Sequence, residues 1–209
     1  MEPKTTFSGS PTQGSGYSKQ LLKSQDAWWR RLFSVQAPYS WNLRRLNLGF
    51  TLDIGCGLGR HLRHLNGNGV GIDHNTTSVQ YARSQGLTVF TPEEFQRSEF
   101  NKPQLFDSML LSHVAEHMAQ KQVVTLLSLY RPLLKADGKL VMITPQEAGF
   151  KKDPTHLEFV DFGKLREIAV ALRFKPLKEY SFPLPHFWGR FFYFNEFISV
   201  NIKLSGPVD

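Results

Sequence analysis

Short apolar runs alternate with amphipathic stretches from about residue 50 to the end of the chain. Apolar runs of four to seven residues that end at Gly, Pro or Asp are typical of buried strands, and apolar positions three or four apart are typical of helices. Strands that alternate with helices favour a parallel sheet with helices on both faces. We therefore expect an α/β fold with strands over residues 51–53, 70–73, 87–90, 105–111, 138–144, 176–182 and 194–204.

The same pattern, with its stop and start signals, predicts the helices between these strands. Asn75 favours the start of a helix and Gly86 favours its end. Pro92 follows Thr91 at a position that suits a first helical turn. We expect helices over residues 60–65, 75–85, 121–134 and 162–172.

The sequence before the first strand divides into a polar tail, a segment with helical spacing and a second short segment that is predicted to be helical. Residues 1–18 are rich in Ser, Gly, Thr and Pro, so we expect a disordered tail. From residue 19 to about 35 the apolar positions, Trp28 and Trp29 among them, have helical spacing. Pro38 is expected to break this helix, and residues 42–48 to form a second short helix. We therefore divide the chain into a tail (1–18) and one domain (19–209), whose first segment is 19–48.

Composition narrows the class of protein. A chain of 209 residues with 41% hydrophobic content fits one domain with a sizeable core. No run approaches the roughly 18 apolar residues of a membrane span, and the N-terminus lacks an apolar signal core. The single cysteine excludes an internal disulfide and suits a reducing cytoplasm. A net charge of +7 favours anionic partners, with a small molecule, a membrane surface or a nucleic acid all open.

The most specific motif lies between the first strand and the first helix, in the run Thr51-Leu-Asp-Ile-Gly-Cys-Gly-Leu-Gly-Arg60. Its glycines let the backbone bend sharply and approach a ligand, and the helix that follows presents free N–H groups. The second strand ends in Asp73, 20 residues after Asp53, a distance that suits a carboxylate on a ribose. A nicotinamide-dinucleotide site is disfavoured, because Arg60 stands where its motif needs a third glycine or an alanine.

The run Leu52-Asp-Ile-Gly-Cys-Gly-Leu-Gly59, together with Asp73, resembles motifs I and II of the class I S-adenosylmethionine-dependent methyltransferases. The stretch 130–140 also resembles the turn that these enzymes share before the fifth strand. The span 36–203 resembles a bacterial branch of the type 11, ubiquinone-biosynthesis-like methyltransferases, which share the Pro-Thr-His and Asn-Glu-Phe segments found here. The resemblance gives no substrate.

The resemblance implies a doubly wound, Rossmann-like sheet of seven strands, mostly parallel, with an antiparallel hairpin of the last two. It implies S-adenosylmethionine as cofactor, and it makes residues 19–48 a helical lid over the cofactor. An acid after the third strand commonly binds adenine in this family. The expected cofactor-binding residues are Asp53, Gly55, Cys56, Gly57, Asp73, His74, Glu93, Ser112, Tyr39 and Asn42.

The exit of the fourth strand carries the most informative chemistry. His113, Glu116 and His117 stand at i, i+3 and i+4, so one helical face is expected to present all three. The order His-x-x-Glu-His also occurs in inverted zinc proteases, a reading that we reject because this helix belongs to a nucleotide-binding type of sheet. A later histidine, His156, follows the fifth strand.

The catalytic candidates are His113, His156 and His117, since an unperturbed histidine titrates near neutrality and can accept a proton from an acceptor hydroxyl. A similar Glu-His pair with a later His binds a divalent metal in small-RNA 3′-end 2′-O-methyltransferases, but His113 replaces a Glu of that pattern. A divalent metal is therefore not favoured here. His113, Glu116, His117 and His156 are the residues that would hold one.

Three functions remain open. The first is an S-adenosylmethionine-dependent methyltransferase for a small-molecule, glycan or lipid-precursor acceptor, which we favour. The second is an RNA-terminal 2′-O-methyltransferase with a His/Glu metal site, and the third a non-catalytic S-adenosylmethionine-binding module. The aromatic segment 187–193 reads as core or interface rather than pocket lining, while His186 and Arg190 suit an anionic acceptor. We expect a monomer or homodimer.

Overall fold

A computed structural model describes residues 36–204 and shows one seven-stranded sheet with the order β3-β2-β1-β4-β5-β7-β6. Strands β1 to β5 run parallel to one another, and β7 is antiparallel to both β5 and β6. The predicted seven-stranded fold with an antiparallel C-terminal pair is confirmed. The strands are β1 Thr51–Ile54, β2 Gly69–Ile72, β3 Val89–Phe90, β4 Phe106–Ser112, β5 Leu134–Pro145, β6 Phe174–Phe182 and β7 Glu196–Lys203.

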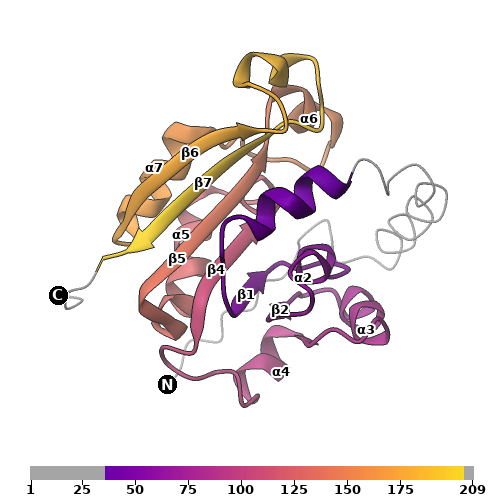
Figure 1. Ribbon diagram of the computed structural model, residues 1–209, viewed down its shortest axis with the longest axis vertical. Helices are drawn as coiled ribbons and strands as arrows, with labels where there is room; N and C mark the ends of the chain where they lie inside the picture. Colours follow the sequence, from indigo (N-terminus) through magenta and orange to yellow (C-terminus); the bar gives the residue numbers. More distant parts are fainter. Residues whose placement is uncertain (1–35, 205–209) are drawn as a thin grey trace.

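Helices cover both faces of this sheet, as the alternating pattern predicts (Figure 1). One face carries α4, α5 and α7, and the other carries α2, α3 and a helical segment at residues 36–44. No helix within residues 36–204 is long and apolar enough to cross a bilayer. The helices are α2 Arg60–His64, α3 Thr76–Ser84, α4 Pro92–Gln96, α5 Gln120–Tyr130, α6 Glu147–Lys152 and α7 Phe162–Ala171, with short 3₁₀ turns η1 Ala115–His117, η2 Arg131–Leu133 and η3 His186–Arg190.

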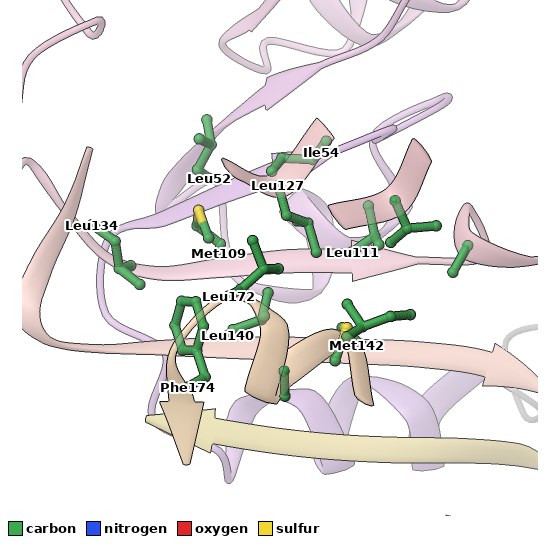
Figure 2. Close-up of a cluster of buried hydrophobic side chains, with 14 of the residues drawn as sticks. Leu52, Ile54, Met109, Leu111, Leu127, Leu134, Leu140, Met142, Leu172 and Phe174 are labelled. Carbon is green, nitrogen blue, oxygen red and sulfur yellow. The ribbon is translucent and has the colours of Figure 1, made fainter. Parts of the chain in front are cut away.

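The larger core lies between the sheet and the α4, α5 and α7 face. Because side chains alternate along a strand, every second residue of the central strands points into this core. Figure 2 shows Leu52, Met109, Leu111 and Leu140 together with Leu127 of α5, all of them buried. Burial of each such side chain contributes about 1.5–3 kcal/mol to folding.

The opposite face is covered by two smaller clusters. Leu43 and Leu48, which flank the end of the N-terminal helix, pack with Val141, Ile198 and their neighbours on β4, β5 and β7. Figure 1 shows this helix in indigo, lying across these strands. The α2 and α3 side forms a separate cluster around Leu62 and Val79.

Several predicted boundaries need correction. The helix at residues 36–44 runs through Pro38, and the expected second helix at 42–48 is absent from the described chain. Instead, Asn47 and Gly49 take left-handed backbone conformations (φ 49° and 62°) that turn the chain into β1. The helix α6 was not predicted, and β5 begins at Leu134 where the end of a helix was expected.

Residues 1–18 of the predicted tail, with 19–35 of the predicted lid, lie outside the described part of the chain. The described segment, residues 36–48, packs on the sheet through Leu43 and Leu48. The lid role stays a prediction.

Candidate functional site

The glycine run forms a tight loop that joins β1 to α2 at the carboxyl edge of the sheet. Gly55, Gly57 and Gly59 all have left-handed φ values, 73°, 53° and 75°, which non-glycine residues adopt at a cost. The loop is tied to β2, because the Gly55 and Cys56 N–H groups donate to Ile72 O at 2.8 and 3.1 Å. The sharp bend that the sequence predicted therefore depends on the glycines and also on the hydrogen bonds between this loop and β2.

The glycines of the loop have different surroundings. A Cβ at Gly55 would lie 2.4 Å from Cγ2 of Val114, so this glycine allows close packing. A Cβ at Gly57 would have no neighbour within 4 Å. Gly57 thus borders open space that a side chain would fill, and we call this space the cradle.

Asp73, which follows β2, closes the cradle from the second strand. Its Oδ2 accepts the Gly57 N–H at 2.7 Å and its Oδ1 accepts the Asn75 N–H at 2.8 Å. Each oxygen keeps a further lone pair, so the carboxylate can still accept from a ribose hydroxyl. The exposed His74 lies beside it, with Nδ1 3.9 Å from Oδ1.

Asp53 lies in β1, next to its end, and is 1% exposed. Its Oδ2 has no hydrogen-bond partner within the described chain. Burial raises the pKa of Asp53 to about 7, the charge of Arg60 opposes this shift, and Asp73 adds to it. A buried carboxyl with an open oxygen at this edge is suited to meet a polar group of a ligand.

The other predicted cofactor residues are spread along the same edge. Ser112 ends β4, and its hydroxyl lies 3.3 Å from Nε2 of His61. Cys56 is buried within the loop, where burial raises the pKa of its thiol and makes it a poor nucleophile. Glu93 is exposed in the first turn of α4.

Tyr39 and Asn42 lie on the N-terminal helix, not on the loop that the sequence predicted. The Tyr39 hydroxyl donates to Phe194 O at 2.7 Å, and burial raises its pKa. Asn42 is buried, and its Oδ1 accepts the Tyr180 hydroxyl of β6 at 2.9 Å. Since β6 lies four strands from β1 in the sheet order, Asn42 acts in packing between this helix and the far edge.

His113 connects two carboxylates. It follows β4 with a left-handed φ of 56°, and its Nε2 lies 2.8 Å from Glu196 Oε1. Its Nδ1 lies 3.3 Å from Glu116 Oε1. Burial lowers the pKa of His113, but the two carboxylates outweigh burial and raise that pKa to about 9.

Glu116, His117 and His156 form a second group beside His113. One ligand-type atom of each lies within 4.8 Å of those of the other two. Glu116 is fully buried, while both imidazoles are partly exposed. The rings of His117 and His156 meet edge to face, with centroids 4.9 Å apart.

The expectation of one helical face for His113, Glu116 and His117 is wrong. Only a 3₁₀ turn, η1, forms here, and His113 precedes it in the left-handed region. The three residues nevertheless come close together, because the tight turn brings Glu116 back toward both imidazoles.

Two features of the site escaped the sequence interpretation. Glu196 begins β7, and because β7 is antiparallel to β5, its first residue lies opposite Pro145 at the carboxyl edge. The sequence alone predicts no role for its Asn-Glu-Phe segment. His61, in α2, contacts both Ser112 and Arg60 at 3.3 Å, and burial lowers its pKa.

Comparison with known proteins agrees with this geometry. A family profile described as a methyltransferase domain matches residues 52–142. An S-adenosylmethionine-dependent methyltransferase from Archaeoglobus fulgidus has a similar structure, with 18% identity and a TM-score of 0.59, over 88% of this chain and 99% of the other. A TehB-like methyltransferase from Corynebacterium glutamicum has 18% identity and a TM-score of 0.63, over 92% and 100%.

A third similar structure is the 1,6-didemethyltoxoflavin-N1-methyltransferase of Burkholderia thailandensis, which was solved with S-adenosylhomocysteine bound. It has 17% identity and a TM-score of 0.59, over 98% of this chain and 93% of the other. No protein of curated function matches the sequence. The domain match and the fold agree with the resemblance: the chain has the fold of the class I S-adenosylmethionine-dependent methyltransferases, and residues 52–142 match a methyltransferase domain.

Proposed function

We propose that this chain transfers a methyl group from S-adenosylmethionine to a small-molecule, glycan or lipid-precursor acceptor. The observation that carries the proposal is the open cradle at Gly57, bordered by Asp73 on β2 and by the partly unpartnered Asp53 on β1. The matched methyltransferase domain spans both strands. When bound, S-adenosylmethionine supplies an activated methyl group.

In this proposal the glycine loop, Asp53 and Asp73 bind different parts of S-adenosylmethionine. Asp73 accepts hydrogen bonds from the ribose hydroxyls, while its bond with the Gly57 N–H holds the loop against it. Asp53 accepts from a polar group of the methionyl part. Gly57 lets the backbone approach the ligand, because no Cβ stands in the cradle.

A histidine is the expected base for the proton that an acceptor hydroxyl loses on methylation. Both nitrogens of His113 are turned to carboxylates, so His113 serves as a positioning group. Nδ1 of His117 and Nδ1 of His156 lie beside backbone carbonyls, which leaves a lone pair on each Nε2. In the metal-free protein, either Nε2 can accept the proton of an acceptor held in line with the methyl group.

Methylation of an RNA end is the second candidate function, and the Glu116, His117 and His156 group is the observation that favours it. Transfer of labelled methyl groups to RNA ends, in a reaction that stops when metal is removed, would select this candidate. Transfer to a small metabolite fraction would select the first. A binding module without activity would bind the cofactor and methylate neither pool.

The substitution Gly57→Ala tests the cradle, with Gly86→Ala as its matched control. Both glycines have left-handed φ values, 53° and 78°, and neither would place a Cβ within 4 Å of another residue. Each substitution should therefore cost a similar amount of stability, about 1–2 kcal/mol. Only Gly57→Ala fills the cradle, and it should weaken S-adenosylhomocysteine binding by about tenfold or more in calorimetric titration, a loss of about 1.4 kcal/mol.

Equal binding by the Gly57→Ala protein and the wild type would place the cofactor elsewhere. A wild-type protein that binds neither S-adenosylmethionine nor S-adenosylhomocysteine would overturn the proposed function itself.

A further inference from the structure

The carboxyl group of Glu116 lies buried beside the histidines of the site. Its side chain is fully buried, and neither of its oxygens receives a hydrogen bond within residues 36–204. Its nearest charged neighbour is His113, whose Nδ1 lies 3.3 Å from Glu116 Oε1. Because an isolated buried carboxylate is costly, buried charges are paired, hydrogen-bonded or coordinated to a metal.

Two imidazoles adjoin this carboxylate in the tautomer that metal ligands use. Nδ1 of His156 lies 2.8 Å from Phe150 O, and Nδ1 of His117 lies 3.2 Å from Thr155 O. A nitrogen next to a carbonyl must be the donor, so in the neutral ring Nδ1 carries the proton and Nε2 is the nitrogen that can bind a metal. Histidines that bind metals are oriented by bonds of this kind.

The segment that carries His156 is fixed to Glu116 through the main chain. The N–H groups of Leu157 and Glu158 both donate to Glu116 O, at 2.7 and 3.1 Å. The ring of Phe150 stacks on His156 with centroids 5.3 Å apart. These contacts hold the three side chains together before any ligand arrives.

We propose that Glu116, His117 and His156 form a binding site for a divalent first-row transition metal such as Mn²⁺, Co²⁺ or Zn²⁺. Their ligand atoms lie within 4.8 Å of one another, and His156 Nε2 is 3.9 Å from Glu116 Oε1. Ligands about 2.1 Å from one ion lie roughly 3–3.5 Å apart, so small side-chain rotations close the site.

The donor set decides the class of metal. Two imidazole nitrogens and one carboxylate oxygen suit first-row transition metals, whereas Mg²⁺ and Ca²⁺ prefer oxygen ligands. Three protein ligands leave at least one coordination position open, as in metal sites that bind a water or a substrate oxygen. The inference concerns metal binding alone and does not depend on the proposed methyl transfer.

His113 is the competing partner of Glu116. Its Nε2 is engaged by Glu196 at 2.8 Å, and only the 3.3 Å contact of Nδ1 reaches Glu116. If this contact alone satisfies Glu116, the site needs no metal, and the experiment below would show that outcome.

The test is titration of chelator-treated, full-length protein with Co²⁺ and with Zn²⁺. We expect one equivalent to bind by calorimetry, with visible Co²⁺ absorption bands and a rise in melting temperature from binding to the native state. Glu116→Gln should weaken binding by about 100-fold or more, since loss of groups that merely support ligands costs about 10–100-fold. His186→Gln is the matched control, because His186 contacts Glu147 at 3.6 Å outside the cluster and should leave binding unchanged.

His117→Gln serves as the second ligand variant if Glu116→Gln fails to fold, because His117 is partly exposed. It should also weaken Co²⁺ binding and abolish the absorption bands. The proposal is overturned if the wild type binds no stoichiometric metal, or if the ligand variants bind as the wild type does. Neither result would affect cofactor binding, so failure here is distinct from failure of the proposed function.

Discussion

At the scale of single residues, Asp53 is a buried carboxyl group whose pKa depends on its neighbours in the site. Its side chain is 1% exposed, and one oxygen lacks a hydrogen bond within the described chain. Burial raises its pKa from 3.8 to about 7, even though Arg60 opposes the shift. At neutral pH the carboxyl is thus close to its own midpoint, and a polar ligand group can shift it to the charged form.

This shift makes a prediction for stability. The folded pKa lies above the unfolded value, so Asp53 contributes stability below about pH 4 and loses that contribution as pH rises through about 7. The full contribution is about 4 kcal/mol at most, at about 1.36 kcal/mol for each pKa unit. Asp53→Asn lacks this titration, so its stability relative to the wild type should increase from pH 5 to pH 8.

Denaturant unfolding of both proteins at the two pH values checks this expectation. The comparison cancels the titration of all other groups that the two proteins share. A constant difference between the proteins at pH 5 and pH 8 would show that Asp53 keeps an ordinary pKa.

At the scale of elements, a buried polar network joins the end of β5, the end of β6 and the start of β7. Gln146 and Asn195 are fully buried. The Asn195 amide donates to Gln146 Oε1 at 2.9 Å and accepts the Leu184 N–H at 2.8 Å. Gln146 in turn donates to the Ser181 hydroxyl at 2.7 Å. This network fixes the start of β7, and with it the position of Glu196 beside His113.

Asn195→Ala removes the centre of this network. It leaves the buried side-chain oxygen of Gln146 and the partly buried Leu184 N–H without these partners, a loss of about 1–3 kcal/mol of stability. The control is Asn101→Ala, whose amide makes an exposed bond to Gln96 O and should change stability by less than about 0.5 kcal/mol. Urea unfolding of both variants measures the difference, and equal losses would contradict the role of the network.

The sequence predicted the central elements well and the irregular ones poorly. β1, β2 and β4 were predicted to within about two residues, because their apolar runs are bounded by Gly, Asp or Pro. A left-handed turn at His113 replaced a predicted helix, and the ring of this residue contacts Glu116 and Glu196. The first of these partners is near in sequence, and the second is 83 residues away.

At the scale of the whole molecule, the central strands carry both the core and the site. β1 and β4 lie side by side in the sheet, so the residues that end them meet at one edge. Their inward side chains form the large core that Figure 2 shows. The position of the site therefore depends on how well this core is packed.

Met109→Ala tests this dependence from the middle of β4. Met109 is fully buried among the core residues of the central strands, so its truncation should cost about 2–5 kcal/mol of unfolding free energy. Leu129→Ala is the matched control, because Leu129 is 60% exposed on α5 and should cost less than about 0.5 kcal/mol beyond propensity. Guanidinium unfolding distinguishes the two, and similar costs would show that the core lies elsewhere.

The sequence by itself determined the α/β class, the glycine loop and the positions of the two acids Asp53 and Asp73, and its resemblance to a methyltransferase family predicted the cofactor. These features are local, because a loop of glycines and a residue at the end of a strand follow from neighbours in the chain. The resemblance grouped His113, Glu116, His117 and His156. The tertiary structure alone added Glu196 as a partner of His113 and fixed the distances within the group. The antiparallel entry of β7 and the main-chain bonds of residues 157 and 158 create those contacts, and no spacing along the chain encodes them.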